Sequence, residues 1–194
     1  VFYNTRSESL AGKTADGTEI TKNDFSIKQT GFRLGGPIIK NKLFFFVNAE
    51  IERRDDPATS WVADRGTEGD NVSRVLASDL DQLKTFLIDR FDYNPGEYEN
   101  YLLNTRSDKA LAKLDYNINK SNRLSFRFNY LKSSRDVLAS NSGSFQNRRD
   151  NGFALNFSNS NYVINNDIYS GIVELNTMLG TKFSNKVQFG YTAN

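Results

Sequence analysis

The sequence GFRLGGPIIKNKLFFFVNAE, from Gly31 to Glu50, decides the fold. Apolar side chains take alternate positions on both sides of a Gly-Gly-Pro sequence, first around Phe32 and then from Leu43 to Ile51. This period of two is that of a β-strand with one apolar face. Because Pro37 has no amide proton, we expect the first strand to stop at Gly-Gly-Pro and residues 36–41 to form the turn. The stretch predicts a β-hairpin, which would also fit a soluble β-sandwich.

The composition combines many aromatic side chains with a polar average. The chain has 15 Phe and 9 Tyr in 194 residues, yet its mean hydropathy is -0.59. Polar residues between apolar ones lower the mean without removing an apolar face, as in transmembrane β-strands, whose lipid-facing and lumen-facing positions alternate. No run approaches the ~20 apolar residues of a transmembrane helix, which excludes a helical membrane protein.

Several classes of function lack the residues they need. The 25 basic and 23 acidic residues are scattered and give a net charge of +2, so no basic stripe indicates a nucleic-acid partner. The chain has neither cysteine nor histidine, which removes disulfides, thiolate nucleophiles and the commonest general base and metal ligand. We therefore expect no enzyme activity, no cofactor and no metal centre.

Alternation of apolar and polar residues predicts a series of strands. The cleanest lies at 123–131, where Leu124, Phe126 and Phe128 alternate with Arg123 and Arg127. Its length matches the ~9–11 residues of a tilted membrane strand. The complete set of expected strands is at about 1–6, 26–35, 42–53, 108–119, 123–131, 168–180 and 186–194.

The connections between these strands alternate between long and short. Long connections at about 7–25, 54–107 and 132–166 are separated by short ones at 36–41, 120–122 and 181–185. In an outer-membrane barrel the short turns lie on the periplasmic side and the long loops outside. The pattern therefore predicts an all-β, antiparallel up-and-down segment of a transmembrane β-barrel. Both chain ends fall within strand-like sequence, so we expect a piece of a larger barrel.

The insertion at 54–107 is expected to contain a helix. Ser78 could cap it, apolar residues recur at helical spacing from Leu80 to Phe91, and Asn94-Pro95-Gly96 would end it. We expect its apolar stripe to dock on its own loop, after an irregular first part of the insertion. In the next long connection a weak strand is possible at 153–157.

The loop residues 54–71 offer two candidate binding features. The stretch is acidic, but its spacing matches no calcium-binding EF-hand, and a solvated loop is the favoured interpretation. Trp61 could stack on a sugar or anchor a peptide, or it could lie buried under its own loop. We retain Trp61 as a candidate for contact with a ligand.

The parity of the strands divides the remaining candidates between two faces. The lumen- or plug-facing candidates are charged: Arg33, Glu50, Lys113, Asp115, Arg127 and Glu174. The lipid-facing candidates are apolar or aromatic: Leu43, Phe45, Val47, Leu114, Tyr116, Leu124, Phe126, Phe128, Val187 and Phe189. For any single charged residue, the polar face of an ordinary sheet is the favoured explanation.

The sequence resembles the barrel of TonB-dependent outer-membrane receptors, specifically the Oar-like group. The resemblance is carried by GFRLGGPIIKNKLFFFVNAE, SDLDQLKTFLIDRFDYNPGEYENY, DKALAKLDYNINKSNRLSFRFNYLKSS and NNDIYSGIVELNTMLGTKFSNKVQFGY, which together cover most of the chain. It implies a twenty-two-stranded barrel filled by a plug, which imports an extracellular ligand with energy transmitted by TonB. The present sequence lacks a recognisable plug and TonB box and has about seven strands.

The resemblance places the chain in the bacterial outer membrane, with lipid, its own plug, the remaining strands, TonB and an unknown extracellular ligand as partners. Two alternatives remain. The long loops could serve an adhesin-like or structural surface role, or the chain could be a soluble β-rich binding module.

Overall fold

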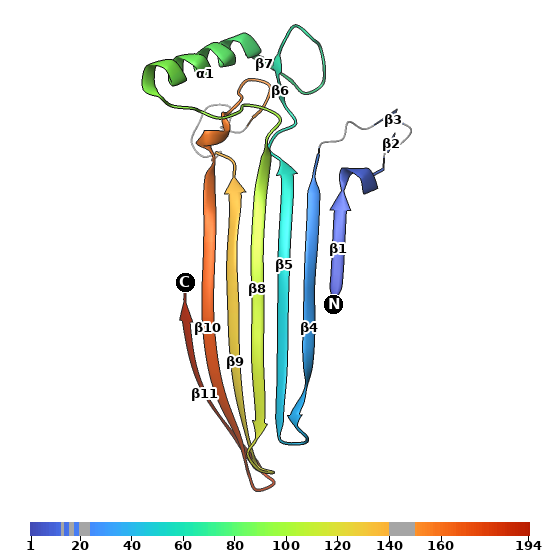
Figure 1. Cartoon of the computed structure of the whole chain (residues 1–194), viewed down its shortest axis with the longest axis vertical. Helices are drawn as coiled ribbons and strands as arrows, with labels where there is room; N and C mark the ends of the chain where they lie inside the picture. The colour runs from blue at the N-terminus through green and yellow to red at the C-terminus, as the bar shows by residue number, and fades with distance from the viewer. Residues whose placement is uncertain (13, 16–17, 20–23, 140–149) are drawn as a thin grey trace.

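The computed structural model describes residues 1–12, 14–15, 18–19, 24–139 and 150–194. A seven-stranded antiparallel sheet dominates it, in which each strand pairs with its neighbours along the chain (Figure 1). The strands are β1 (Phe2–Ser7), β4 (Ser26–Ile39), β5 (Leu43–Pro57), β8 (Leu102–Asn117), β9 (Asn122–Val137), β10 (Tyr162–Leu179) and β11 (Phe183–Ala193). The expected up-and-down topology is confirmed. Within the described residues the sheet is open, because β1 and β11 each pair on one side only.

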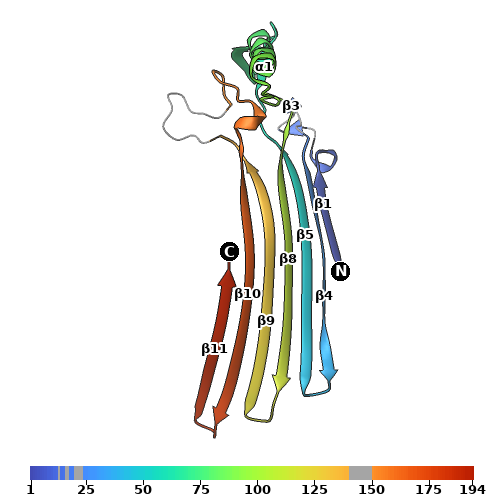
Figure 2. The same cartoon turned by 60° about the vertical axis from the view of Figure 1, so that its left-hand side comes forward.

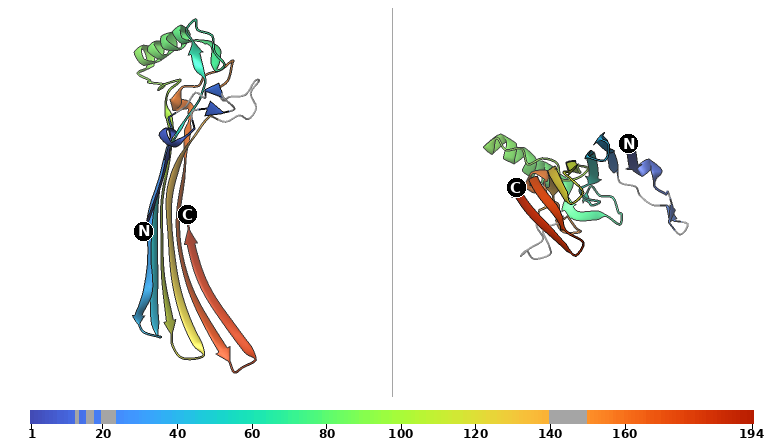
Figure 3. Two further views of the ribbon diagram at one scale, coloured as in Figure 1. Left: turned by 90° about the vertical axis from the view of Figure 1, so that its right-hand side faces the viewer. Right: turned by 90° about the horizontal axis from the view of Figure 1, so that it is seen from below.

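Smaller elements lie in the long connections. They are η1 (Glu8–Leu10), β2 (Thr14–Ala15), β3 (Thr18–Glu19), β6 (Val62–Asp64), β7 (Val72–Leu76), α1 (Ala77–Phe91) and η2 (Ser158–Ser160). The long connections gather at one end of the sheet and the short turns at the other (Figures 1 and 3). The predicted alternation of long and short connections therefore corresponds to two ends of one sheet.

The first hairpin turns later than predicted. β4 continues through Gly-Gly-Pro to Ile39, with a register shift between Pro37 and Ile39, and Asn41 takes the positive φ of the turn. Proline is tolerated here because it lies at this register shift, where the ladder to β5 is interrupted. The predicted turn at 36–41 is therefore wrong: these residues extend the strand as far as Ile39.

Four strands also extend further toward the long loops than predicted. β5 reaches Pro57 and β8 begins at Leu102, so the connection between them runs from 58 to 101 rather than from 54 to 107. β9 and β10 are longer in the same direction. The extensions escaped the sequence pattern because both faces of the sheet become polar there. Arg53 and Asp108, for example, form an ion pair of 2.6 Å on the face that is apolar further down.

The helix differs from expectation at its start. It begins at Ala77 directly after β7, and Leu76 precedes it without a side-chain capping bond, so Ser78 is not the cap. It ends at Phe91, where Asp92 adopts a left-handed conformation with φ of 51°. The preceding stretch is not wholly irregular, because β6 pairs in parallel with β7. The possible strand at 153–157 reduces to one isolated bridge between Asn151 and Ala154.

The hydrophobic core lies outside the sheet. Ala63, Ala77, Leu80 and Tyr98 are buried together within the connection from β5 to β8. The sheet strands carry many exposed apolar side chains, such as Phe126 and Phe189. No helix in the described residues is long and apolar enough to cross a membrane.

Candidate functional surfaces

The sheet register places the charged candidates on one face. Residues directly opposite in paired strands share a face, and Arg127 lies opposite Lys113 while Glu50 lies opposite Lys109. The same register brings together all the lumen- or plug-facing candidates: Arg33, Glu50, Lys113, Asp115, Arg127 and Glu174. We call this the charged face.

Ion pairs between and along strands connect most of the charged face. Lys109 lies 2.8 Å from Glu50, and Lys186 lies 2.6 Å from Glu174. Asp115 accepts from Lys113 at 2.8 Å and also contacts Arg123. Within the described residues, Arg33 and Arg127 form no such pair, and both are exposed. These two candidates therefore carry guanidinium groups that no ion pair occupies.

The opposite face holds every lipid-facing candidate. Leu43, Phe45, Val47, Leu114, Tyr116, Leu124, Phe126, Phe128, Val187 and Phe189 lie on it by the same register. From Leu43 to Ile51 this apolar band is about 27 Å long at about 3.4 Å per residue, close to the ~25 Å apolar band of an outer-membrane barrel. On the side of the long connections it ends at Tyr130 and Tyr169, whose ring centroids are 5.4 Å apart.

Two long connections combine into one cap over the end of the sheet. The connection at 58–101 supplies the buried core, and Leu155 and Phe157 from the connection after β9 pack against it. Tyr98 and Phe157 meet edge to face with ring centroids 5.8 Å apart. The helix therefore docks partly on its own loop, as predicted, and partly on the next long loop. We call residues 58–101 and 150–161 the cap.

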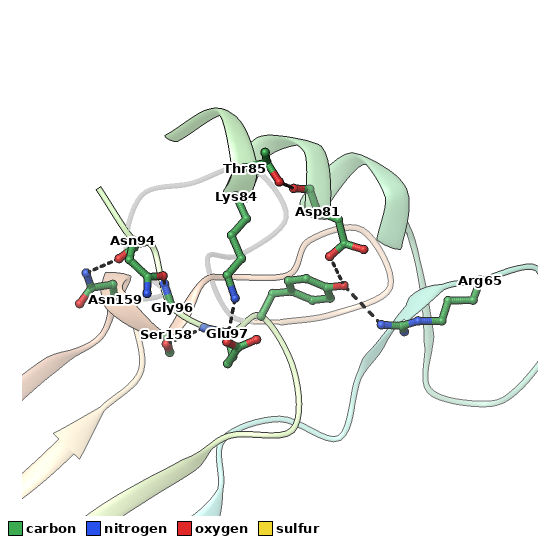
Figure 4. A network of polar contacts seen from close by, with 10 residues as sticks. Arg65, Asp81, Lys84, Thr85, Asn94, Gly96, Glu97, Ser158 and Asn159 are labelled. Carbon is green, nitrogen blue, oxygen red and sulfur yellow. Dashed lines mark hydrogen bonds and ion pairs between the residues drawn. The ribbon is translucent and has the colours of Figure 1, made fainter. Parts of the chain in front are cut away.

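A network of polar contacts holds α1 against the rest of the cap (Figure 4). The Tyr98 hydroxyl donates to Asp81 at 2.9 Å and accepts from Arg65 at 3.3 Å. Arg65 also forms an ion pair with Glu99. Lys84 donates to Glu97 at 2.7 Å. Polar contacts thus reach α1 from both flanks of the core.

The contacts of Tyr98 and Arg65 shift the pKa values of both side chains. Burial, together with the hydrogen bond to Asp81, raises the pKa of the Tyr98 phenol. The hydrogen bond to Glu99 raises the pKa of the Arg65 guanidinium. Tyr98 therefore stays neutral and donates its proton, while Arg65 stays charged, across the physiological pH range.

Hydrogen bonds join the two connections on either side of Gly96. Glu97 N–H donates to the Ser158 hydroxyl at 3.0 Å, and Ser158 N–H donates to the Glu97 carbonyl at 2.7 Å. Asn159 N–H donates to the Pro95 carbonyl at 3.0 Å. These reciprocal bonds hold η2 against the segment after α1.

The outward side of α1 is apolar and uncovered. Leu83, Phe86 and Phe91 are 45%, 55% and 62% exposed, although Leu83 and Phe91 belong to the stripe expected to dock. A pocket of about 590 Å³ lies beside Phe86, and its other lining residues are polar or charged: Asp81, Gln82, Thr85, Asp89 and Arg90. The helical spacing of apolar residues gives no signal for this surface, because the exposed Leu83 and Phe91 share it with the buried Leu80.

Trp61 does not line this pocket. It is partly buried, and its ring lies against the backbone of Gly152, from the other long connection. In the acidic stretch, Asp64 accepts from the Gly66 amide at 2.7 Å and Asp56 pairs with Arg54 at 2.5 Å. Within the described residues, no group of three or more acidic side chains is arranged to hold a metal ion.

Comparison with known families agrees with this geometry. A family model described as an outer membrane beta barrel domain matches residues 1–70, which include β1, β4 and β5. This sheet is part of a bacterial outer-membrane β-barrel. No curated protein and no solved structure matches the chain. An outer-membrane location does not fit the soluble β-rich module that the sequence also allowed.

Proposed function

We propose that the chain belongs to the barrel of a TonB-dependent outer-membrane receptor of the Oar-like group. Such a receptor binds an extracellular ligand and imports it with energy transmitted by TonB. The observation that carries the proposal is the two-sided sheet, with a charged face opposite a continuous apolar band and with every long connection at one end. In this proposal the receptor binds and transports a ligand rather than catalysing a reaction.

The two faces then acquire roles. The apolar band contacts lipid, and the charged face lines the lumen and contacts the plug, with the unpaired Arg33 and Arg127 available for acidic groups of the plug. Further strands would pair with the free edges of β1 and β11. The cap, which includes Trp61 and the exposed side of α1, is the part that would meet the extracellular ligand.

The direct test uses the full-length protein isolated from outer membranes. We expect it to bind the periplasmic domain of TonB, and a protein that assembles in the membrane but shows no such binding would contradict the proposal. Arg127→Leu tests the lumen assignment: we expect normal assembly with weaker retention of the plug. If Arg127→Leu instead abolishes assembly, the placement of the charged face is wrong.

An adhesin-like surface role is the second candidate, because the uncovered apolar side of α1 is a surface suited to a protein partner. Deletion of residues 58–101 separates the two. We delete 58–101 rather than the 54–107 suggested by sequence, because the larger deletion would shorten β5 and β8. Loss of cell-surface adhesion with unchanged TonB-dependent uptake would favour the adhesin-like role.

A further inference from the structure

The three short turns of the sheet carry basic side chains and no acidic ones. They lie at the end of the sheet away from α1 (Figure 2). Asp and Glu are absent from residues 38–42, 118–123 and 180–186. The same ranges contain Lys40, Lys42, Lys120, Arg123, Lys182 and Lys186. The fold therefore gathers at this end a positive charge that is dispersed in the sequence.

Carboxylates of the charged face neutralise two of these basic residues. Arg123 lies 3.1 Å from Asp115, and Lys186 lies 2.6 Å from Glu174. The other four are exposed and form no ion pair within the described residues: Lys40, Lys42, Lys120 and Lys182. We call these four lysines the basic rim.

Three lysines of the basic rim border one pocket. Asn117 N–H donates to the carbonyl of Lys42 at 2.8 Å, which holds the turn after β4 beside the turn after β8. A pocket of about 630 Å³ lies at these two turns, and the basic residues that line it are Lys40, Lys42, Lys120 and Arg123. Its lining contains no carboxylate. The pocket therefore favours a group with net negative charge.

Apolar and aromatic side chains accompany the basic rim. Nζ of Lys42 lies 5.9 Å from the ring centroid of Tyr116, which belongs to the apolar band. Ile118 and Phe183, in the other two short turns or directly beside them, are exposed. Lysine beside apolar and aromatic residues is typical of a membrane interface, where the ammonium group reaches the headgroups and the stem stays among apolar groups. A soluble acidic partner would account for the lysines but not for these apolar side chains.

We propose that the basic rim binds anionic phospholipid headgroups in the periplasmic leaflet of the outer membrane. The short turns of an outer-membrane barrel lie on the periplasmic side, where the leaflet consists of phospholipids. The lysine ammonium groups contact the lipid phosphates, and a headgroup without an ammonium group of its own, such as that of phosphatidylglycerol, leaves the negative charge uncompensated for them. The inference rests on the barrel assignment and on the orientation of the sheet, not on ligand import.

The test uses the full-length protein in detergent micelles, titrated separately with phosphatidylglycerol and phosphatidylethanolamine that have identical acyl chains. Native mass spectrometry measures the affinity for each lipid. We expect the unmodified protein to bind phosphatidylglycerol more tightly. Lys42→Gln combined with Lys120→Gln should weaken that binding by about 25-fold, at about fivefold for each lysine, with little effect on phosphatidylethanolamine. Lys42→Arg combined with Lys120→Arg should keep the preference, because arginine retains the charge.

The matched control combines Lys28→Gln with Lys132→Gln. It removes the same charge at the other end of the sheet, where carboxylates such as Asp55 and Asp108 accompany the basic side chains, and it should keep the preference. Equal affinity of the unmodified protein for both lipids would overturn the proposal in favour of an acidic protein partner. An equal loss in the rim variant and the control would also overturn it, because the response would then follow net charge alone.

The outcome is separate from that of the proposed function. Heat-modifiable mobility on gels shows whether each variant is folded, and an unmodified protein that never assembles would contradict the barrel assignment itself. Absence of TonB binding by an assembled protein would count against the receptor proposal and leave the lipid preference to be decided by the titration.

Discussion

Gly96 lies where the two long connections of the cap touch, and its missing side chain permits that contact. Its φ is 87°, and a Cβ atom there would lie 2.0 Å from the hydroxyl oxygen of Ser158. Gly66 has a similar φ of 82° but open space around it. Substitution of either glycine by alanine has the cost of a left-handed backbone, but only substitution of Gly96 adds a collision.

We predict that Gly96→Ala detaches residues 150–161 from residues 58–101 within the cap. The added methyl group cannot coexist with the Ser158 hydroxyl where it accepts from Glu97 N–H, so the segment should lose protection against hydrogen exchange. Gly66→Ala has the same backbone cost, of order 1–3 kcal/mol, without the collision. Equal loss of protection in the two variants would contradict the assigned role of Gly96.

A second prediction concerns pH. Oδ1 of Asp150 accepts from the Asn156 backbone at 2.7 Å and from its side chain at 3.0 Å, and burial raises the pKa of this carboxyl above its ordinary value. A raised folded-state pKa gives stability that is complete below the ordinary carboxyl pKa and is lost as the pH rises through the folded pKa. Hydrogen-exchange protection of residues 150–161, corrected for the intrinsic rate, should therefore increase toward acidic pH.

Asp150→Asn should remove this pH dependence, because the amide keeps the acceptor but does not titrate. Asp89→Asn changes an exposed carboxylate on α1 and should leave the dependence in place. Persistence of the full dependence in Asp150→Asn would show that another group in the cap titrates.

At the scale of one element, β9 allows the two faces of the sheet to be compared. Phe126 lies on the apolar band between Leu114 and Val173, whereas Asn129 lies on the charged face between Leu111 and Ser170. We predict that Phe126→Arg opposes membrane assembly by about 2–4 kcal/mol near the bilayer midplane. Asn129→Arg should have little effect. Heat-modifiable mobility on gels measures the assembled fraction, and similar assembly of both variants would contradict the assignment of the faces.

Strand pattern and loop order could be predicted from the sequence because one apolar face makes the period of two unambiguous. From Leu124 to Tyr130, a shift of one residue would exchange the faces completely. The ends of β5 and β8 could not be predicted, because ion pairs such as Arg53 with Asp108 replace the apolar pattern there. Gly-Gly-Pro misled the prediction, since a proline at a register shift can be accommodated within a strand.

The cap was predictable only in part. The helical spacing from Leu80 to Phe91 correctly indicated α1. Local sequence cannot show that Leu155 and Phe157, beyond two intervening strands, complete the core under it. For the same reason the apolar side of α1 that would stay exposed could not be distinguished from the side that docks.

For the whole molecule, the orientation of the sheet can be tested with cysteine, which the 194 residues lack. We predict that a membrane-impermeant maleimide labels Gln82→Cys in intact cells, because α1 lies at the end with the long connections. Ser121→Cys, in the short turn between β8 and β9, should react only after the outer membrane is permeabilised. Labelling of Ser121→Cys in intact cells would reverse the proposed orientation.

Because two long connections contribute side chains to the core of the cap, the cap must be completed in a fixed order during folding. Leu80 and Tyr98 precede β8 in the chain, whereas Leu155 and Phe157 follow β9. Complete burial of the core must therefore wait until the β8–β9 hairpin has formed and returned the chain to the same end of the sheet. Until then α1 lacks Leu155 and Phe157 as partners, so its packing reports on a late stage of assembly and would serve as a kinetic marker for the arrival of β9.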